Sequence, residues 1–378
     1  MQGNETVLAG KTIATRTDLV KDSAMSSSWM IYGANGYTGE LIAREAVARR
    51  HRPVLAGRDR SAVEPLARAL DCESRIFPLD LRMGQSLAGI TAVVHCAGPF
   101  SATSDPMVRA CLESGTHYLD ITGEIEVFES IFMRDHDARS ASVALIPGVG
   151  FDVVPTDCLA AMLSDALPSA TALSLAFHAK GGRISRGTLR TMIEGLPHGG
   201  AIRTDGKIVP VPVAYDIREI PFGSGTKTAM TIPWGDVSTA FHTTGIPNIR
   251  VYTPVSMRTA NRLRRRGPLL RVLRFAPLRH LVQSVVARRG GPDEAVRERA
   301  RSYLWGEVRD GSGRSVSLTM ETPDGYSFTA VSAVRAVEKV LNGSVDPGAW
   351  TPAVAFGSHF VEEIPGASVG AIASHGQC

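Results

Sequence analysis

Residues 30–42 read MIYGANGYTGELI, an apolar run followed by a glycine-punctuated turn and a helix-like pattern. This order predicts a strand, a turn and a helix. Glycines at this spacing let the chain turn sharply, bring bare backbone N–H groups close to a pyrophosphate, and let the helix pack on the sheet. The helix N-terminus then faces the anion with its partial positive charge. The predicted cofactor contacts in this turn are Gly33, Asn35, Gly36, Tyr37, Thr38 and Gly39.

A second apolar run, at 54–57, ends in Arg58 and Asp59, at about the distance that a first βα unit requires. A carboxylate at the tip of this strand would accept the ribose hydroxyls of NAD, whereas Arg58 offers a fork for the 2′-phosphate of NADP. We therefore expect NADP, with NAD as the less favoured alternative that Asp59 keeps open. A solvated loop arginine is the structural alternative for Arg58.

Length and composition are those of an ordinary globular protein. The 378 residues suggest two domains, and a net charge of +4 does not argue for nucleic-acid binding. The five cysteines show neither metal-ligand spacing nor a disulfide framework. We therefore expect no metal site and a reducing, cytoplasmic compartment.

The two ends of the chain differ in composition from the rest. Residues 1–24 lack a signal-peptide core and are expected to form a disordered tail, with Met25 as an alternative translation start. Residues 366–378 are small and polar, and we expect a second disordered tail there. Because no stretch reaches about 18 uninterrupted apolar residues, the sequence predicts no membrane-spanning helix.

The alternation of strands and helices continues to about residue 155. A β-branched run at 90–96 ends in a glycine-proline turn. The carboxyl ends of parallel strands line the cofactor crevice in a doubly wound sheet, so this turn should lie against the cofactor. An ordinary strand-ending turn is the alternative. The predicted contacts are Ala97, Gly98, Pro99 and Phe100.

Polar side chains follow the next two strands, and they are the catalytic candidates. A strand around 116–121 leads into a polar turn, a helix is expected over 125–140, and a buried strand over 143–147 precedes a second turn. A helix over 158–167 could be capped by Thr156 or Asp157, and a capping and a functional role for Asp157 stay equally open. The residues expected at strand ends facing the crevice are Tyr118, Asp120, Glu124 and Asp152.

The chain resembles the saccharopine dehydrogenase-like oxidoreductases, a family that includes trans-acting enoyl reductases. The likeness runs from about residue 30 to about residue 365. It is carried by the blocks 32–39, 55–58, 97–100, 115–124, 147–152, 185–188, 233–236 and 351–357. The resemblance implies a Rossmann fold and a nicotinamide cofactor. It points much less specifically to a reaction.

The second half of the chain is broken by glycine and proline and suits an α+β domain on a mixed sheet. Short strands are predicted from residue 173 to residue 332, the last of them at 327–332, followed by helices at 333–341 and 352–360. The predicted organisation is a Rossmann-type doubly wound parallel sheet over 25–155, an α+β substrate or dimerisation domain over 156–332, and C-terminal helices over 333–365 that return to the first domain.

Two segments of the second half carry charge in unusual patterns. Ser185, Arg186 and Thr188 combine a hydroxyl cap, a cation and backbone donors, and the family resemblance favours a substrate role for them over plain helix capping. The segment 261–301 contains twelve arginines interleaved with apolar residues. Such a segment can lie on an anionic membrane surface or receive an acidic carrier, or it can be a domain helix with solvated arginines.

The sequence therefore predicts an NADPH-dependent oxidoreductase. By analogy with the enoyl-reductase branch, it would reduce a C=C, C=N or C=O bond of an apolar or carrier-borne substrate. The alternative is an NADP-binding scaffold or membrane-associated protein without catalysis. A homodimer and a peripheral membrane contact through 261–301 are further predictions, and no nucleic-acid partner is expected.

Overall fold

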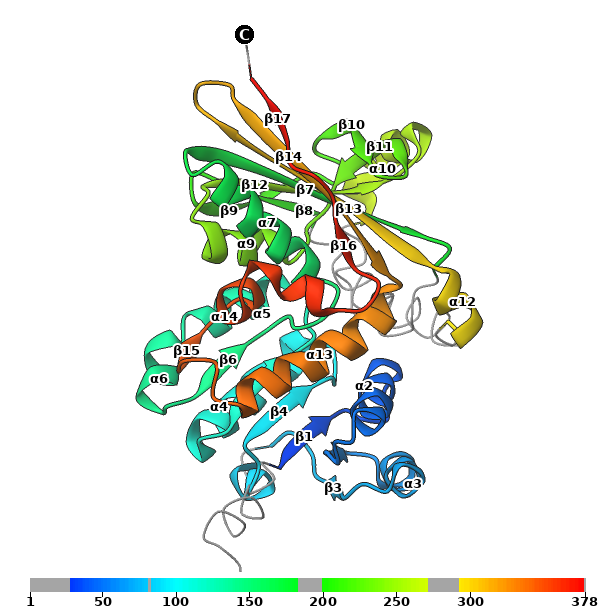
Figure 1. Cartoon of the computed structure of the whole chain (residues 1–378), viewed down its shortest axis with the longest axis vertical. Coiled ribbons are helices and arrows are strands. Elements are labelled where there is room, and N and C mark those ends of the chain that lie inside the picture. The colour runs from blue at the N-terminus through cyan, green and yellow to red at the C-terminus, as the bar shows by residue number, and fades with distance from the viewer. Residues whose placement is uncertain (1–27, 81–82, 183–198, 271–291, 377–378) are drawn as a thin grey trace, which may run out of the picture.

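The computed structural model describes residues 28–80, 83–182, 199–270 and 292–376. The described chain forms two sheets with helices packed between and around them. Figure 1 shows the first sheet in the lower half of the molecule and the second in the upper half. Helix α7 (Val154–Ala166) connects the two sheets: it follows a strand of the first sheet in the chain and precedes the first strand of the second. The fold class predicted from the sequence, a Rossmann-type domain with a second mixed-sheet domain, is confirmed.

The first sheet is parallel throughout and runs in the order β15-β6-β5-β4-β1-β2-β3. Its strands are β1 (Trp29–Tyr32), β2 (Val54–Gly57), β3 (Ser74–Ile76), β4 (Ala92–His95), β5 (His117–Asp120), β6 (Ala144–Ile146) and β15 (Gly348–Ala349). The strand order reverses between β1 and β4. In a doubly wound sheet, this switch point is where a ligand binds, beyond the carboxyl ends of the strands.

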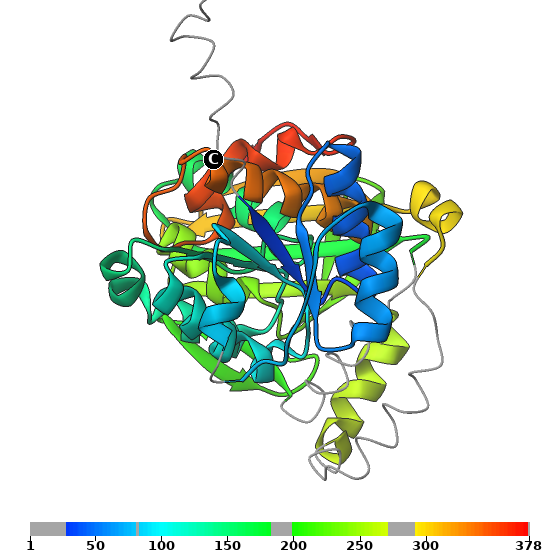
Figure 2. The same cartoon turned by 90° about the horizontal axis from the view of Figure 1, so that it is seen from below.

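Helices cover both faces of this sheet because its strands are apolar on both faces. The helices after β1 to β5 are α2 (Tyr37–Ala48), α3 (Arg60–Leu70), η1 (Met83–Leu87), α4 (Phe100–Ser114), α5 (Ile125–Phe132) and α6 (Asp135–Ser140). Helix α13 (Gly325–Leu341) packs beside α2, and Figure 2 shows both on one side of the sheet. A bidentate pair, Arg49 Nε and Nη2 to the two Glu338 oxygens at 2.9 and 2.7 Å, joins the two helices.

The second sheet is mixed and has ten strands, with the main order β10-β11-β12-β7-β13-β14-β16. Its strands are β7 (Ala170–Lys180), β8 (Gly200–Thr204), β9 (Lys207–Val211), β10 (Ile217–Phe222), β11 (Gly225–Thr231), β12 (Asn248–Pro254), β13 (Arg301–Asp310), β14 (Ser315–Pro323), β16 (Ser368–Val369) and β17 (Ala373–His375). The remaining helices are α9 (Asp236–Thr244), α10 (Met257–Leu270), α12 (Glu294–Arg299), α14 (Pro352–Phe356) and η4 (Ser358–Glu363). One apolar core joins this sheet, through α7, to the helices of the first.

The strand predicted at 327–332 is wrong, because these residues lie inside α13. The β-branched Thr329 and Val331 suggested a strand. In the structure, the Asp324 side chain accepts hydrogen bonds from the N–H groups of Tyr326 and Ser327 and so begins a helix there. Once the helix has begun, the apolar positions that follow face the core with helical spacing.

The single helix predicted over 125–140 is two helices, α5 and α6, which separate after Phe132. The exposed Met133 marks the break. Asp135 and Asp137 lie in the first turn of α6, where negative charge complements the helix dipole. The helix predicted at 352–360 likewise divides into α14 and η4 at Gly357, whose φ of +90° favours glycine.

Two further predictions are corrected at the ends of elements. Helix α7 begins at Val154, before Thr156 and Asp157, so neither residue is its cap. Pro155 in the first turn explains the earlier start, since proline is tolerated there. The tail predicted as disordered from residue 366 contains β16 and β17, which pair with the edge strand β14. The predicted disorder of residues 1–24 concerns a segment outside the described residues.

None of the helices in the described part of the chain combines the length and apolar character that a bilayer crossing requires. The predicted cytoplasmic location and peripheral membrane contact stay predictions.

Candidate functional site

The turn after β1 brings backbone segments so close together that only glycine fits at its key positions. Gly33 has a φ of +84°, and a Cβ on it would lie 2.8 Å from the Ala97 nitrogen. A Cβ on Gly39 would lie 2.3 Å from the Gly33 oxygen. The turn itself is fixed by hydrogen bonds from the Gly33 and Ala34 N–H groups to the Ala56 oxygen. Helix α2 is therefore held against the ends of β1 and β4.

The first turn of α2 is arranged to receive an anion. Its N–H groups, at Tyr37, Thr38 and Gly39, have no intrahelical partner because a helix leaves its first donors unbonded. Asn35 and Gly36, immediately before, are exposed. Unbonded N–H groups and the positive end of the helix dipole are the elements that hold a pyrophosphate. The residues present thus fit a nicotinamide dinucleotide, and they are those predicted from the sequence.

The end of β2 carries an exposed arginine next to an aspartate that is already hydrogen-bonded within the chain. Asp59 Oδ1 accepts hydrogen bonds from the Ser61 N–H at 3.0 Å and the Ser61 hydroxyl at 2.7 Å, as the N-cap of α3. These bonds hold the pKa of the Asp59 carboxyl below its usual range. Arg58 is exposed at the strand tip. Asp59 is thus engaged by its own helix, and Arg58 is the side chain that remains available to a ligand.

Residues from the second half of the chain close over the glycine turn, which sequence reasoning did not predict. The Tyr37 hydroxyl donates to the Pro292 oxygen at 2.6 Å, and Arg297 on α12 donates to the Tyr37 hydroxyl at 3.0 Å. The Tyr326 ring meets the Tyr37 ring edge-on, with centroids 5.1 Å apart. The spacing of the arginines around Arg297 does not predict this contact, because Arg297 and Tyr37 lie 260 positions apart in the sequence.

The glycine-proline turn after β4 lies beside the cofactor turn, as the Gly33 contact with Ala97 shows. Gly98 and Pro99 are exposed, whereas Phe100 is buried. Glu124 accepts hydrogen bonds from the N–H groups of Phe100 and Ser101, at 2.9 and 2.8 Å, and so caps the N-terminus of α4. The catalytic candidate Glu124 is therefore placed next to the predicted cofactor contacts, in a capping position.

Tyr118 and Asp120 lie on β5, which ends at Asp120 as predicted, but neither side chain is exposed. Both are fully buried on the α4 side of the sheet, and the Tyr118 hydroxyl donates to Asp120 Oδ2 at 2.7 Å. Asp120 Oδ1 also accepts from the N–H groups of Thr122 and Gly148. Burial raises the pKa of Asp120 to about 6, against these hydrogen bonds. Neither residue faces the crevice, and the pair ties the ends of β5 and β6 together.

Asp152 is the catalytic candidate that the structure leaves chemically available. It follows β6, is only partly buried, and its Oδ2 lies 3.0 Å from the position of a Cβ on Gly123, in the loop after β5. Within the described residues, its carboxyl group makes no hydrogen bond. Burial raises the pKa of this carboxyl to about 6. Its backbone oxygen accepts from Trp234 Nε1 at 2.8 Å, which fixes the residue against the second half of the chain.

Two further carboxyl groups lie behind Asp152, where α7 packs on α9. Asp157 accepts hydrogen bonds from the Thr243 hydroxyl and, at 2.8 Å, from the Ala353 N–H. Asp236 is fully buried, and neither of its carboxyl oxygens has a hydrogen-bond partner among the described residues. Burial raises the pKa of Asp236 well above its usual value. The structural role for Asp157 is thereby supported, in joining α7 to α9 and α14 rather than in capping α7.

Three predicted substrate residues, Ser185, Arg186 and Thr188, lie outside the described residues, as does most of the arginine-rich segment. Helix α10 contains the start of this segment, up to Leu270. Its Arg264 donates to the backbone oxygens of Ala214 and Tyr215, so α10 is tied to the domain at that point. The predicted membrane and carrier contacts, and the homodimer, stay predictions.

A parallel sheet in this order, with a glycine turn after its first strand, is the architecture of dinucleotide-binding domains. Residues 29–145 match the family model described as the saccharopine dehydrogenase NADP-binding domain. Over these residues the chain is similar to that family, which confirms the predicted resemblance.

The relatives agree with the assignment. A Bos taurus saccharopine dehydrogenase-like oxidoreductase is 30% identical over 150 residues, covering 34% of this chain and 35% of the relative. A Mycobacterium tuberculosis protein named provisionally as a trans-acting enoyl reductase is 31% identical over 183 residues, 44% of this chain and 43% of that protein. The alignments thus span about a third to under a half of these relatives' length.

A solved structure extends the likeness of fold to nearly the whole chain. The apo form of Saccharomyces cerevisiae saccharopine dehydrogenase (L-Glu forming) superposes with a TM-score of 0.64, covering 93% of this chain and all of that one, at 11% identity. At this identity, the match shows the fold alone.

We predict that Gly39→Ala disrupts the site. A Cβ there would meet the Gly33 oxygen at 2.3 Å, so helix α2 must move away from the turn. We expect a loss of about 1–3 kcal/mol in unfolding free energy and loss of NADPH binding, measured by denaturant titration and nucleotide fluorescence. Gly84→Ala is the control, because a Cβ there meets no described residue within 4 Å. Unchanged NADPH affinity in Gly39→Ala would contradict the assignment of this turn as the pyrophosphate-binding site.

The buried carboxyl of Asp236 predicts a pH dependence of stability. A raised native pKa keeps the native group protonated while the unfolded one ionises above about pH 4, so the wild type loses stability as pH rises from there toward the native pKa. Asp236→Asn cannot ionise. Its unfolding free energy, relative to wild type, should therefore increase between pH 4 and pH 7, whatever constant offset the amide adds. The exposed Asp165→Asn is the control, and a pH-independent difference for Asp236→Asn would refute the assignment.

Proposed function

We propose that this protein is an NADPH-dependent reductase that transfers hydride to a C=C, C=N or C=O bond of an apolar or carrier-borne substrate. Support comes from the NADP-binding domain family of residues 29–145 and from the relatives named as oxidoreductases and as an enoyl reductase. The proposal concerns the whole chain, of which those relatives match only a part.

The observation that carries the proposal is the state of Asp152. Reduction of a double bond needs a proton donor beside the acceptor, and a carboxyl group with a pKa of about 6 keeps its proton to higher pH than an ordinary aspartic acid. Asp152 is partly exposed and lies where the loops after β5 and β6 meet. By contrast, the Tyr118 hydroxyl is buried and donates to Asp120, so it cannot reach a substrate without breaking the core.

Aromatic side chains next to Asp152 support an apolar substrate. The Phe177 and Trp234 ring centroids are 4.6 Å apart, and the Phe151 ring meets Phe177 edge-on at 6.4 Å. All three rings are partly exposed. They come from the loop after β6, from β7 and from the loop before α9, so they border Asp152 on the side of the second sheet. Rings in this position favour a flat or aliphatic substrate over a charged one.

In this mechanism, each group of the chain has one task. Bound NADPH supplies the hydride. The N–H groups at the start of α2 hold the pyrophosphate, and Arg58 binds the 2′-phosphate. Asp152 donates the proton, while its backbone bond to Trp234 keeps the carboxyl in place. The aromatic rings exclude water from the acceptor.

We favour NADPH over NADH because the Asp59 carboxylate is already hydrogen-bonded to Ser61. A carboxylate that selects NAD must accept both ribose hydroxyls, whereas Asp59 already caps α3 through Ser61. We predict that Arg58→Ala weakens NADPH binding about tenfold or more and leaves NADH binding nearly unchanged, as measured by nucleotide fluorescence titration. Arg68→Ala, which removes the same charge from the far end of α3, is the control. Equal weakening for both nucleotides would refute the assignment of Arg58.

We predict that Asp152→Asn lowers kcat by about 10²- to 10⁴-fold and leaves NADPH affinity unchanged. The assay is NADPH oxidation with enoyl thioesters, cyclic imines and ketones. In the wild type, the rate should be highest below pH 6 and fall as pH rises through the Asp152 pKa, because the acid form is the donor.

Tyr118→Phe is the matched control for Asp152→Asn. It removes one hydroxyl from the buried pair and should lower stability while leaving kcat near the wild-type value. A large kcat loss in Tyr118→Phe together with an active Asp152→Asn would reverse the assignment. If NADPH binds but no substrate class is reduced, the non-catalytic scaffold becomes the better account.

A further inference from the structure

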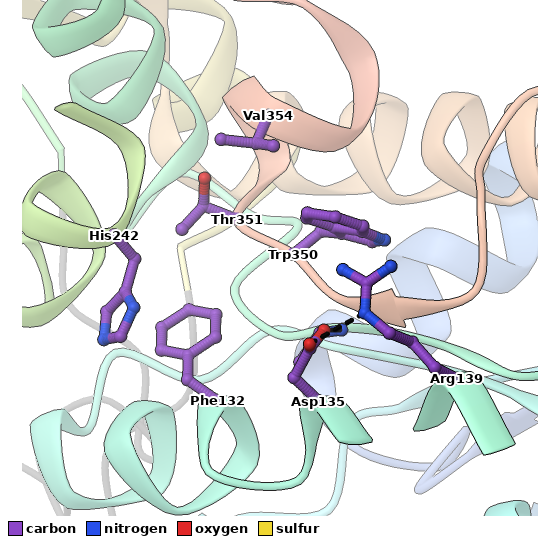
Figure 3. Close-up of a pocket in the computed structure, with 8 residues that line it drawn as sticks. Phe132, Asp135, Arg139, His242, Trp350, Thr351 and Val354 are labelled. Carbon is purple, nitrogen blue, oxygen red and sulfur yellow. Dashed lines mark hydrogen bonds and ion pairs between the residues drawn. The ribbon is translucent and has the colours of Figure 1, made fainter. Parts of the chain in front are cut away.

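A pocket lies beside β15, the strand at one edge of the first sheet, whereas the cofactor turn follows the interior strand β1. It has a volume of about 250 Å³ and is formed where β15 ends, between α5, α6, α9 and the start of α14. Strands β6, β5 and β4 separate β15 from β1. Figure 3 shows seven of its side chains surrounding a common space. The pocket and the cofactor turn both lie at the carboxyl ends of the strands, but they have no residue in common.

One wall of this pocket carries a guanidinium that is already held in place. Arg139 Nε donates to Asp135 Oδ2 at 2.8 Å, while Asp135 Oδ1 accepts from the Ala349 N–H at 2.9 Å. The bond from Arg139 holds the pKa of Asp135 below its usual range, so the carboxylate stays charged. The Arg139 guanidinium also lies over the Trp350 ring, 4.8 Å from its centroid. These contacts orient the side chain without using its terminal nitrogens.

The terminal nitrogens of Arg139 are the available donors of the pocket. Within the described residues they form no hydrogen bond, and Figure 3 shows them turned away from Asp135 and toward Trp350. A planar fork of this kind matches the two oxygens of a carboxylate. Because Asp135 and Trp350 already contact the half-exposed arginine, a ligand would lose less side-chain freedom on binding.

The rest of the lining is flat and largely apolar. The Phe132 and His242 rings lie with centroids 4.1 Å apart on the wall facing Trp350, and Val354, 45% exposed, borders the opening. A volume of about 250 Å³ is below the usual range for drug-sized ligands, so only a small molecule fits. The wall shapes favour a planar body.

We propose that this pocket binds a small carboxylate with a flat apolar body, its carboxylate on the Arg139 fork and its ring between Trp350 and the Phe132–His242 pair. The site is separate from the cofactor site and does not depend on the proposed reductase activity. It is linked to the interior by Thr351, whose hydroxyl lies 2.6 Å from that of Thr243, the partner of Asp157 on α7. Hydrogen bonds therefore connect the pocket lining to α7, the helix that follows the Asp152 loop.

The test is fluorine NMR of para-fluorobenzoate with the full-length protein, with and without saturating NADPH. We expect saturable broadening that NADPH does not displace, and at least a tenfold loss of affinity in Arg139→Gln. Arg139→Lys, which keeps the charge without the fork, should bind more weakly than wild type. Arg109→Gln removes the same charge from a surface arginine paired with Asp105 and should bind like wild type.

Four results would overturn the proposal. One is equal affinity in wild type, Arg139→Gln and Arg139→Lys, which would place the ligand elsewhere. Another is displacement by NADPH, which would place it in the cofactor site. The third is displacement by inorganic phosphate at the same concentration, which would mean that the ring does not contribute to binding. Equal binding of para-fluorobenzyl alcohol would likewise mean that the carboxylate does not contribute. Matching thermal melts of the variants exclude misfolding as the cause.

Discussion

Close backbone packing at the end of β1 is the constraint on which the rest of the molecule depends. With no side chains at Gly33 and Gly39, helix α2 can start directly against the turn and against the end of β4. That closeness places the first N–H groups of α2 at the switch point of the sheet. It also gives α13 a surface to pack on beside α2, so the C-terminal part of the chain is positioned by the same turn.

Hydrogen bonding distinguishes the carboxyl groups that hold the structure together from the one that is available for catalysis. Asp120 and Asp157 are fully buried and hold backbone N–H groups from distant segments, so each acts as a clamp between elements. Asp152 has no such partner among the described residues and is reachable from the surface. Burial raises the pKa of Asp120 and of Asp152 alike to about 6, so accessibility and the lack of a clamping role are what suit Asp152 to proton transfer.

Sequence reasoning worked best where a local pattern carried the information. The glycine turn and the strands of the first sheet were predictable because each is a short apolar run with turn chemistry at its end. The Tyr118 assignment was wrong in its placement, although the signal was present: residues 118 and 120 share one face of a strand whose two faces are both covered. The segment 327–332 was misread because the cap that begins α13 lies upstream, at Asp324.

Local sequence thus settled the fold class, the cofactor class and the backbone conformation of the glycine turn, since these depend on neighbouring residues. Tertiary structure alone decided which acid is available, which residue closes over Tyr37, and that a pocket exists at the end of β15. Arg139, His242 and Trp350 come from three separate parts of the chain, and no spacing in the sequence marks them as neighbours. Their contact arises only because a short late strand, β15, adds to the edge of the sheet beside β6.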